Sequence, residues 1–226
     1  MESGCVHIDS VSARRRLDAS TGSLALAKAN GSVAQDFLLT PTTTFKYYLN
    51  PGHGWNDYDN GSYDTGAEGS GYCEAELASE LAKMVEAYCA DYGLEVINGE
   101  QFELPYWERL PKAISLGCDA IVSIHFDYGA GAGDGTSTMV GTHGKAPGSD
   151  ALNDIIHEKL VAALGLRDIG TTHRSDITCV NGDIPSMLME VAFMDNESNI
   201  SRYLSRRDEV ARAIAEGMYE ASLELS

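Results

Sequence analysis

The chain has 226 residues, of which 43% are hydrophobic, and 34 acidic against 16 basic side chains give it a formal net charge of −18 at pH 7. This size and apolar content suit one globular α/β domain and exclude a chain that is disordered throughout. The acidic balance excludes a nucleic-acid-binding surface, which needs clustered basic side chains, and no apolar run reaches the roughly 20 residues of a membrane span.

The first 43 residues are rich in Ser, Ala, Gly and Thr and end in the extended-looking stretch TPTTT. We expect a leader or linker at residues 1–43 and one folded domain at residues 44–226. The start, MESGCVHIDS, lacks a basic region followed by an apolar one, which predicts a protein made in the cytoplasm without a signal peptide. The five cysteines form no CxxC pair, so we expect reduced and mostly buried thiols.

From Phe45 onward, apolar runs of strand length alternate with amphipathic stretches of helix length. This alternation predicts an α/β fold, a three-layer sandwich with a mostly parallel central sheet flanked by helices on both faces. The expected strands are FKYYLN, LEVIN, AIVSIHF, TSTMVGT and PSMLMEVAF. The expected helices cover residues 74–92, 106–116, 150–164, 198–204 and 207–223.

Three polar side chains lie at or just after the ends of predicted strands. His53 lies in the turn NPGHG after the first strand, His125 lies near the end of AIVSIHF, and Glu190 falls late in PSMLMEVAF. The carboxyl ends of parallel strands meet at one edge of a sheet, where diverging loops open a crevice. The sequence therefore predicts that two imidazoles and a carboxylate lie together at this edge.

Glu74 opens the first predicted helix, after the glycine-rich stretch GSYDTGAEGSGYC. In helical projection it lies about 20° from Leu81, on the apolar stripe, whereas Glu76 lies nearly opposite. A buried carboxylate is costly unless positive charge meets it, and a metal held by two histidines supplies that charge. Two His and one Glu leave the fourth position of a tetrahedral zinc open, as in catalytic sites, and Glu190 then fits a general base.

Four motifs in order carry a resemblance to a known family: YYLNPGHG, TGAEGSGYCEAEL, ERLPKAISLGCDAIVSIHFD and IPSMLMEVAFMDN. Over residues 46–224 the chain resembles the zinc amidases of the Amidase_3 type, which include bacterial autolysins and phage endolysins. The resemblance implies one zinc ion per chain held by His53, Glu74 and His125, with Glu190 as the catalytic residue. It implies hydrolysis of the amide bond between N-acetylmuramic acid and L-alanine in bacterial peptidoglycan.

Three further side chains are candidates for binding substrate: Arg109, Asp127 and His143. Arg109 matches an arginine of the family for which a structural role is an equal alternative. Asp127 stands where the family commonly has Asn, and Asn50 stands where it usually has Asp. Asn196 matches a family Asn that we expect to cap the following helix.

The stretch FDYGAGAGDGTST is interpreted as a mobile loop on the substrate side. A nucleotide-binding loop is disfavoured because the stretch joins strand to strand and lacks GxGxxG. The remaining histidines, His7, His157 and His173, are expected not to bind metal.

Other functions remain open at this point. A carboxypeptidase-like zinc wall peptidase could use the same metal ligands, and a non-catalytic module could bind wall fragments without cutting them. A Cys–His hydrolase using Cys73 or Cys118 is a more distant alternative, since neither is placed beside a defined base. A phage or prophage lysin that reaches the wall after release, or a fragment of an autolysin, would fit the context, and the oligomeric state is open.

Overall fold

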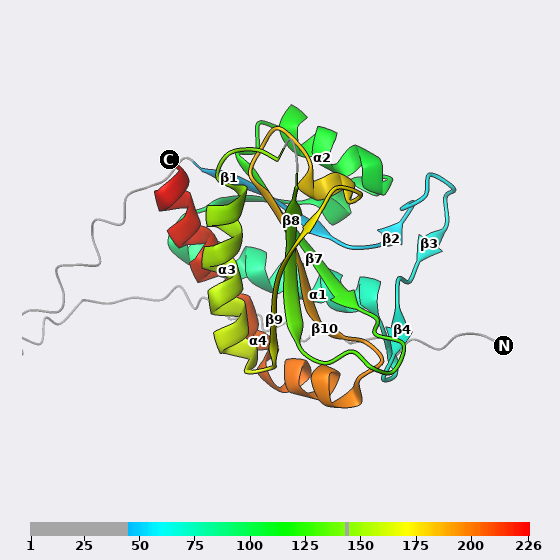
Figure 1. Cartoon of the computed structure of the whole chain (residues 1–226). Coiled ribbons are helices and arrows are strands. Elements are labelled where there is room, and N and C mark those ends of the chain that lie inside the picture. Colours follow the sequence, from blue (N-terminus) through cyan, green and yellow to red (C-terminus); the bar gives the residue numbers. More distant parts are fainter. Residues whose placement is uncertain (1–44, 143–144) are drawn as a thin grey trace, which may run out of the picture. The chain divides into compact units, whose positions relative to one another are not determined.

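The computed structural model of the chain describes residues 45–142 and 145–226 (Figure 1). Its centre is a six-stranded sheet in the order β6-β1-β7-β10-β8-β9. The strands are β1 (Lys46–Pro51), β6 (Glu95–Asn98), β7 (Ala120–Asp127), β8 (Thr136–Gly141), β9 (Asp168–Arg174) and β10 (Ser186–Phe193). Strands β6, β1, β7 and β10 run parallel, and β8 pairs antiparallel with β10 and parallel with β9. The prediction of a mostly parallel sheet is confirmed.

Helices cover both faces of this sheet (Figure 1). On one face lie α1 (Glu74–Cys89), α3 (Ser149–Leu164) and α4 (Glu197–Leu225); on the other lie α2 (Tyr106–Ser115) and the 3₁₀ turn η4 (Thr178–Val180). Consecutive residues of β1 point to opposite faces. The Tyr47 hydroxyl donates to the Met218 carbonyl of α4 at 2.7 Å, whereas Tyr48 packs with Leu110 of α2. The fold is the predicted three-layer sandwich.

Two short ribbons lie between β1 and α1. The first pairs β2 (Gly54–Trp55) with β3 (Tyr63–Asp64), and the second pairs β4 (Glu68–Gly69) with β5 (Tyr72–Cys73). Two further 3₁₀ turns, η2 (Ala90–Tyr92) and η3 (Gly99–Phe102), flank β6. Gly93 follows η2 with a φ of +70°, the left-handed conformation in which glycine ends a helix.

Strand β9 was not among the predicted strands. The strand lies at the edge of the sheet, and five of its seven residues are exposed. A strand without a buried face shows no apolar alternation, so its sequence carries little of the signal that identifies strands.

Helix α4 is one continuous helix of 29 residues, where two helices were predicted. Residues 205–207, at the expected break, include no Gly or Pro, and their arginines form ion pairs, Arg206 with Glu209 and Arg207 with Glu80. The helix begins as expected, because the Asn196 side chain accepts the backbone N–H groups of the second and third helical residues at 3.1 and 3.2 Å.

The glycine-rich segment between β7 and β8 is held against the start of α4. The Asp195 carboxylate accepts the backbone N–H groups of Gly129 at 3.0 Å and of Gly131 at 2.5 Å. A Cβ on Gly133 would lie 2.0 Å from the ring of Phe193. The glycines thus permit close packing, a role that the interpretation as a mobile loop did not anticipate.

Some predictions fall outside the described part of the chain, namely the leader at residues 1–43, His7 and His143. The four cysteines at positions 73, 89, 118 and 179 are buried thiols, as expected. Across residues 45–142 and 145–226, none of the helices combines the length and the apolar character that crossing a bilayer requires.

Candidate metal site and cleft

His53, Glu74 and His125 meet at the edge of the sheet where β1 and β7 end. His53 lies in the loop after β1, Glu74 is the first residue of α1, and His125 lies near the end of β7. The His53 Nε2 atom lies 3.0 Å from the Glu74 Oε2 atom, and the His125 Nδ1 atom lies 2.9 Å from the Glu74 Oε1 atom. One donor atom from each residue lies within 4.8 Å of the other two. The structure therefore brings the three predicted metal ligands together.

The Glu74 side chain is only 5% exposed, and each of its oxygens has a second partner. The backbone N–H groups of Ala67 and Phe126 donate to this carboxylate, both at 3.0 Å. Burial raises the pKa of Glu74, but hydrogen bonds from His125 and His53 outweigh it and hold the pKa well below its usual range. Glu74 is therefore ionised at neutral pH, as a metal ligand must be.

Asp64, on β3, orients His53. Its Oδ2 atom lies 2.6 Å from the His53 Nδ1 atom, which leaves Nε2 facing Glu74. Burial lowers the pKa of His53, yet the hydrogen bonds and charges of Glu74 and Asp64 more than compensate and raise it to about 9. A carboxylate behind a ligand histidine fixes the ring and its tautomer. Asp64 was not among the predicted site residues, because an acid in a glycine-rich loop shows no sequence pattern that marks it as a partner of a histidine.

Two glycines of the sequence motifs leave the space that the three ligands occupy. A Cβ on Gly52 would lie 2.3 Å from the ring of His125. A Cβ on Gly66 would lie 2.5 Å from the ring of His53 and 2.8 Å from Glu74, and the φ of Gly66 is +66°. Any larger residue at these two positions displaces a candidate ligand.

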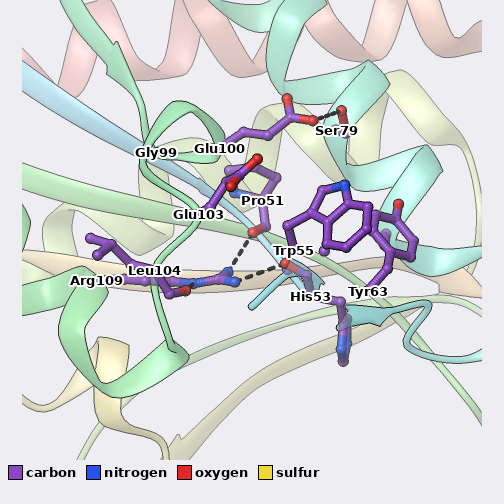
Figure 2. Close-up of a pocket in the computed structure, with 13 residues that line it drawn as sticks. Pro51, His53, Trp55, Tyr63, Ser79, Gly99, Glu100, Glu103, Leu104 and Arg109 are labelled. Carbon is purple, nitrogen blue, oxygen red and sulfur yellow. Dashed lines mark hydrogen bonds between the residues drawn. The ribbon is translucent and has the colours of Figure 1, made fainter. Parts of the chain in front are cut away.

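Arg109, on α2, is buried and holds the loop that carries His53 (Figure 2). Its Nη atoms donate to the carbonyls of Pro51 at 2.7 Å and His53 at 2.8 Å, and its Nε donates to Leu104 at 3.1 Å. It also forms an ion pair with buried Asp57 at 2.5 Å. His53 has a φ of +60°, a left-handed conformation that few non-glycine residues adopt, and these contacts support it. Of the two roles predicted for Arg109, these contacts favour the structural one.

A second group of possible ligands, His53, Asp57 and Asp64, also has donor atoms within 4.8 Å of one another. Asp57 is already paired with Arg109, whose fixed positive charge opposes a cation at this position. Among the described residues, Glu74 forms its ion pairs with His53 and His125 and none with Arg109, so the donor set around Glu74 is the better candidate.

Glu190 lies beside His125, because the two residues are register partners on the neighbouring parallel strands β10 and β7. Partners in register point to the same face of a sheet. Within the described part of the chain, the buried Oε2 atom of Glu190 has no hydrogen-bond partner. Burial raises the pKa of Glu190 well above its usual value, and the negative charges of Glu74 and Asp127 raise it further, against a smaller opposing effect of Arg174. A carboxylate in this setting accepts a proton readily.

A cleft of about 430 Å³ connects these groups. His53, Glu74, His125 and Glu190 line it, together with Asp127, for which substrate binding was predicted. One Asp127 oxygen accepts the backbone N–H of Tyr128 at 2.7 Å. The volume lies in the range of small-molecule binding sites, and the donor groups converge on one wall.

The alternative of a cysteine nucleophile does not fit the structure. Cys73 and Cys118 are buried, and burial raises the pKa of Cys118 to about 11. A reactive cysteine needs an accessible thiolate with a lowered pKa. Among the other histidines, His157 bonds to Asp168 at 2.9 Å and His173 is exposed on β9; neither lines the cleft.

Known proteins share both sequence and fold with this chain. The chain is 30% identical over 185 residues to the N-acetylmuramoyl-L-alanine amidase LytC of Bacillus subtilis, an alignment that covers 80% of this chain and 36% of LytC. It is 26% identical to the amidase CwlM of Bacillus licheniformis, over 78% of this chain and 68% of CwlM. The catalytic domain of the amidase CwlV from Bacillus (Paenibacillus) polymyxa has the same fold, with a TM-score of 0.69 at 24% identity over 80% of this chain and 99% of that domain.

The alignment thus spans about a third of the length of LytC. The model of one protein family, described as N-acetylmuramoyl-L-alanine amidase, matches residues 48–220. This match begins in β1 and ends in α4, so it includes every strand that delivers a candidate ligand or base. The chain belongs to the Amidase_3 family of N-acetylmuramoyl-L-alanine amidases.

Proposed function

We propose that this chain is a zinc-dependent N-acetylmuramoyl-L-alanine amidase that hydrolyses the amide bond between N-acetylmuramic acid and L-alanine in bacterial peptidoglycan. One observation carries the proposal. In a chain of this family, a His–Glu–His group with a buried glutamate and a carboxyl with a raised pKa line the same cleft. This combination is what metal-assisted hydrolysis of an amide requires.

The donor set fits zinc. Imidazole nitrogens and a carboxylate oxygen are preferred zinc ligands, and catalytic zinc sites use three protein ligands. Glu74 is ionised by its environment, and Asp64 holds the His53 ring with Nε2 turned toward the site. When bound by His53, Glu74 and His125, zinc supplies Lewis-acid chemistry, polarising the amide carbonyl and activating water for attack.

Glu190 moves the proton in the proposed reaction. As water adds to the amide carbon, Glu190 takes one of its protons, and it then gives this proton to the nitrogen of the departing L-alanine. The C–N bond breaks, leaving a carboxylate on the lactyl group and a free amino group on the peptide. The raised pKa of Glu190 suits both steps, because the group must bind and release a proton near neutral pH.

The experiment incubates the zinc-loaded protein with purified peptidoglycan and identifies the products by N-terminal labelling and mass spectrometry. We expect new N-terminal alanine and peptide-free glycan. Glu190→Gln should reduce the rate by about 10²–10⁴-fold while it still binds one zinc per chain. Glu158→Gln, at an exposed position on α3, is the matched control and should have full activity.

Two results would contradict the proposal. New amino termini on residues other than alanine would identify a wall peptidase. Wall binding without bond cleavage, unchanged in Glu190→Gln, would identify a binding module.

A further inference from the structure

Exposed aromatic side chains gather around the cleft. Among the described residues, the large aromatic side chains that are exposed are Trp55, Tyr58, Tyr63, Tyr106, Trp107 and Tyr128, with exposed fractions between 39% and 56%. Three of them, Tyr58, Tyr106 and Tyr128, line the cleft that contains Glu190. Trp55 and Tyr63 line a second, smaller pocket of about 100 Å³, which shares His53 and Arg109 with the cleft (Figure 2).

Three of these rings form one connected surface, the aromatic platform, made of Tyr58, Tyr106 and Trp107. The ring centroids of Tyr58 and Tyr106 are 6.0 Å apart and those of Tyr106 and Trp107 are 4.9 Å apart, both in edge-to-face arrangement. Tyr58 belongs to the loop between β2 and β3, and the other two open α2. A backbone hydrogen bond of 3.0 Å from Tyr106 to Asp57 ties the two segments together. This hydrogen bond joins the two backbone segments that carry the platform.

The exposure of these rings indicates that they bind a ligand. Single exposed apolar residues are ordinary, but a contiguous group beside a cleft marks a binding surface. The three rings are 56%, 45% and 40% exposed, so each keeps much of its apolar area available for contact. Flanking the platform in sequence are the exposed acids Asp59 and Glu108, which can accept hydrogen bonds from hydroxyl groups.

We propose that the aromatic platform binds the glycan strand of the substrate, seating an N-acetylated sugar ring next to the scissile amide; this deepens the proposed function and rests on it. A sugar ring has an apolar C–H face that covers an aromatic ring and a hydroxyl edge that bonds to carboxylates. Because Tyr58 and Tyr106 share the cleft with Glu190, a sugar seated on them lies beside the carboxyl that moves the proton.

Charge favours the glycan over the peptide stem as the occupant. While the lactyl carboxyl is tied in the amide bond, the sugar is uncharged and is not repelled by an acidic protein. The peptide stem carries free carboxylates that need a basic partner. Among the lysine and arginine residues of the described part of the chain, Arg109 is the one that lines the cleft, and it is already paired with Asp57.

Binding of chitotetraose, a neutral oligomer of N-acetylglucosamine, tests the proposal directly. Isothermal titration calorimetry with the zinc-loaded protein should show binding that Tyr106→Ala and Tyr58→Ala each weaken by at least about fivefold. Tyr58→Phe keeps the ring and should bind like the wild type. Leu223→Ala removes an equally exposed apolar side chain on α4 and serves as the control. Zinc content and thermal stability should be unchanged in all four variants.

The same variants separate this inference from the proposed function. On peptidoglycan, the alanine variants should raise KM by a similar factor and leave kcat within about twofold. If chitotetraose does not bind, or binds the alanine variants as well as the wild type, the platform inference is wrong even where alanine is still released. Platform-dependent binding of the stem peptide L-Ala-γ-D-Glu-L-Lys in place of chitotetraose would also overturn it. Platform-dependent chitotetraose binding without amide cleavage would support the platform and contradict the proposed function.

Discussion

Replacing Arg109 with methionine removes the side chain that holds the His53 loop. The change deletes four hydrogen bonds of 3.1 Å or shorter and leaves Asp57, which is 4% exposed, without its ionic partner. Removing one member of a buried ion pair costs about 3–5 kcal/mol, and methionine retains much of the apolar volume of the arginine stem. For a domain of this size, 1 kcal/mol corresponds to about 2–4 °C, so Tm should fall by about 6–20 °C.

Differential scanning calorimetry measures this change, with Arg206→Met as the control. Arg206 forms an exposed ion pair with Glu209, and such pairs contribute about 0–1 kcal/mol. Adding Asp57→Asn to Arg109→Met should recover part of the loss, because no buried charge then remains unpaired. Equal Tm values for Arg109→Met and Arg206→Met, or no recovery in the double variant, would refute the view that this buried pair supports the loop.

Three further predictions concern the metal site and the proposed base. Asp64→Ala frees the imidazole that it holds, so zinc affinity should fall by about 10–100-fold in a competition titration; unchanged affinity would show that the 2.6 Å contact has no orienting role. Gly52→Ala places a Cβ 2.3 Å from the His125 ring, so zinc content by mass spectrometry should fall well below one per chain. Zinc content that stays at one per chain in Gly52→Ala would contradict the steric explanation. In the metal-free protein, the pKa of Glu190 is higher in the folded state than in the unfolded chain, so the folded state binds more protons at this group. The contribution of Glu190 to the free energy of unfolding therefore falls as the pH rises above about 4.5. Glutamine does not titrate, so thermal denaturation of Glu190→Gln should not show this pH-dependent loss of stability. A difference in stability between variant and wild type that stays constant from about pH 4 to pH 9 would contradict the raised pKa.

The sequence alone predicted the positions that meet at the cleft because parallel topology makes strand ends coincide. His125 and Glu190 lie in the last half of their strands and His53 lies just after its strand, all in the parallel part of the sheet, so the fold class determines that they share one edge. Helical periodicity placed Glu74 on the buried face of α1, where the structure has it. These are regularities of secondary structure, which a single sequence carries.

Contacts that depend on irregular backbone could not be predicted from the sequence. Asp64 reaches His53 through the pairing of two-residue strands, and no periodicity describes such a ribbon. The role of Arg109 depends on which carbonyls face it, and the φ of +60° at His53 has no sequence signature outside glycine. Sequence patterns therefore identified the candidate ligands but not the residues that position them.

Anomalous diffraction at the zinc edge, on crystals of the zinc-loaded protein, tests the central claim most directly. The account predicts one peak per chain, about 2.0–2.2 Å from the His53 Nε2 atom, the His125 Nδ1 atom and a Glu74 oxygen. A peak between Asp57 and Asp64, or no peak within reach of Glu74, would contradict it.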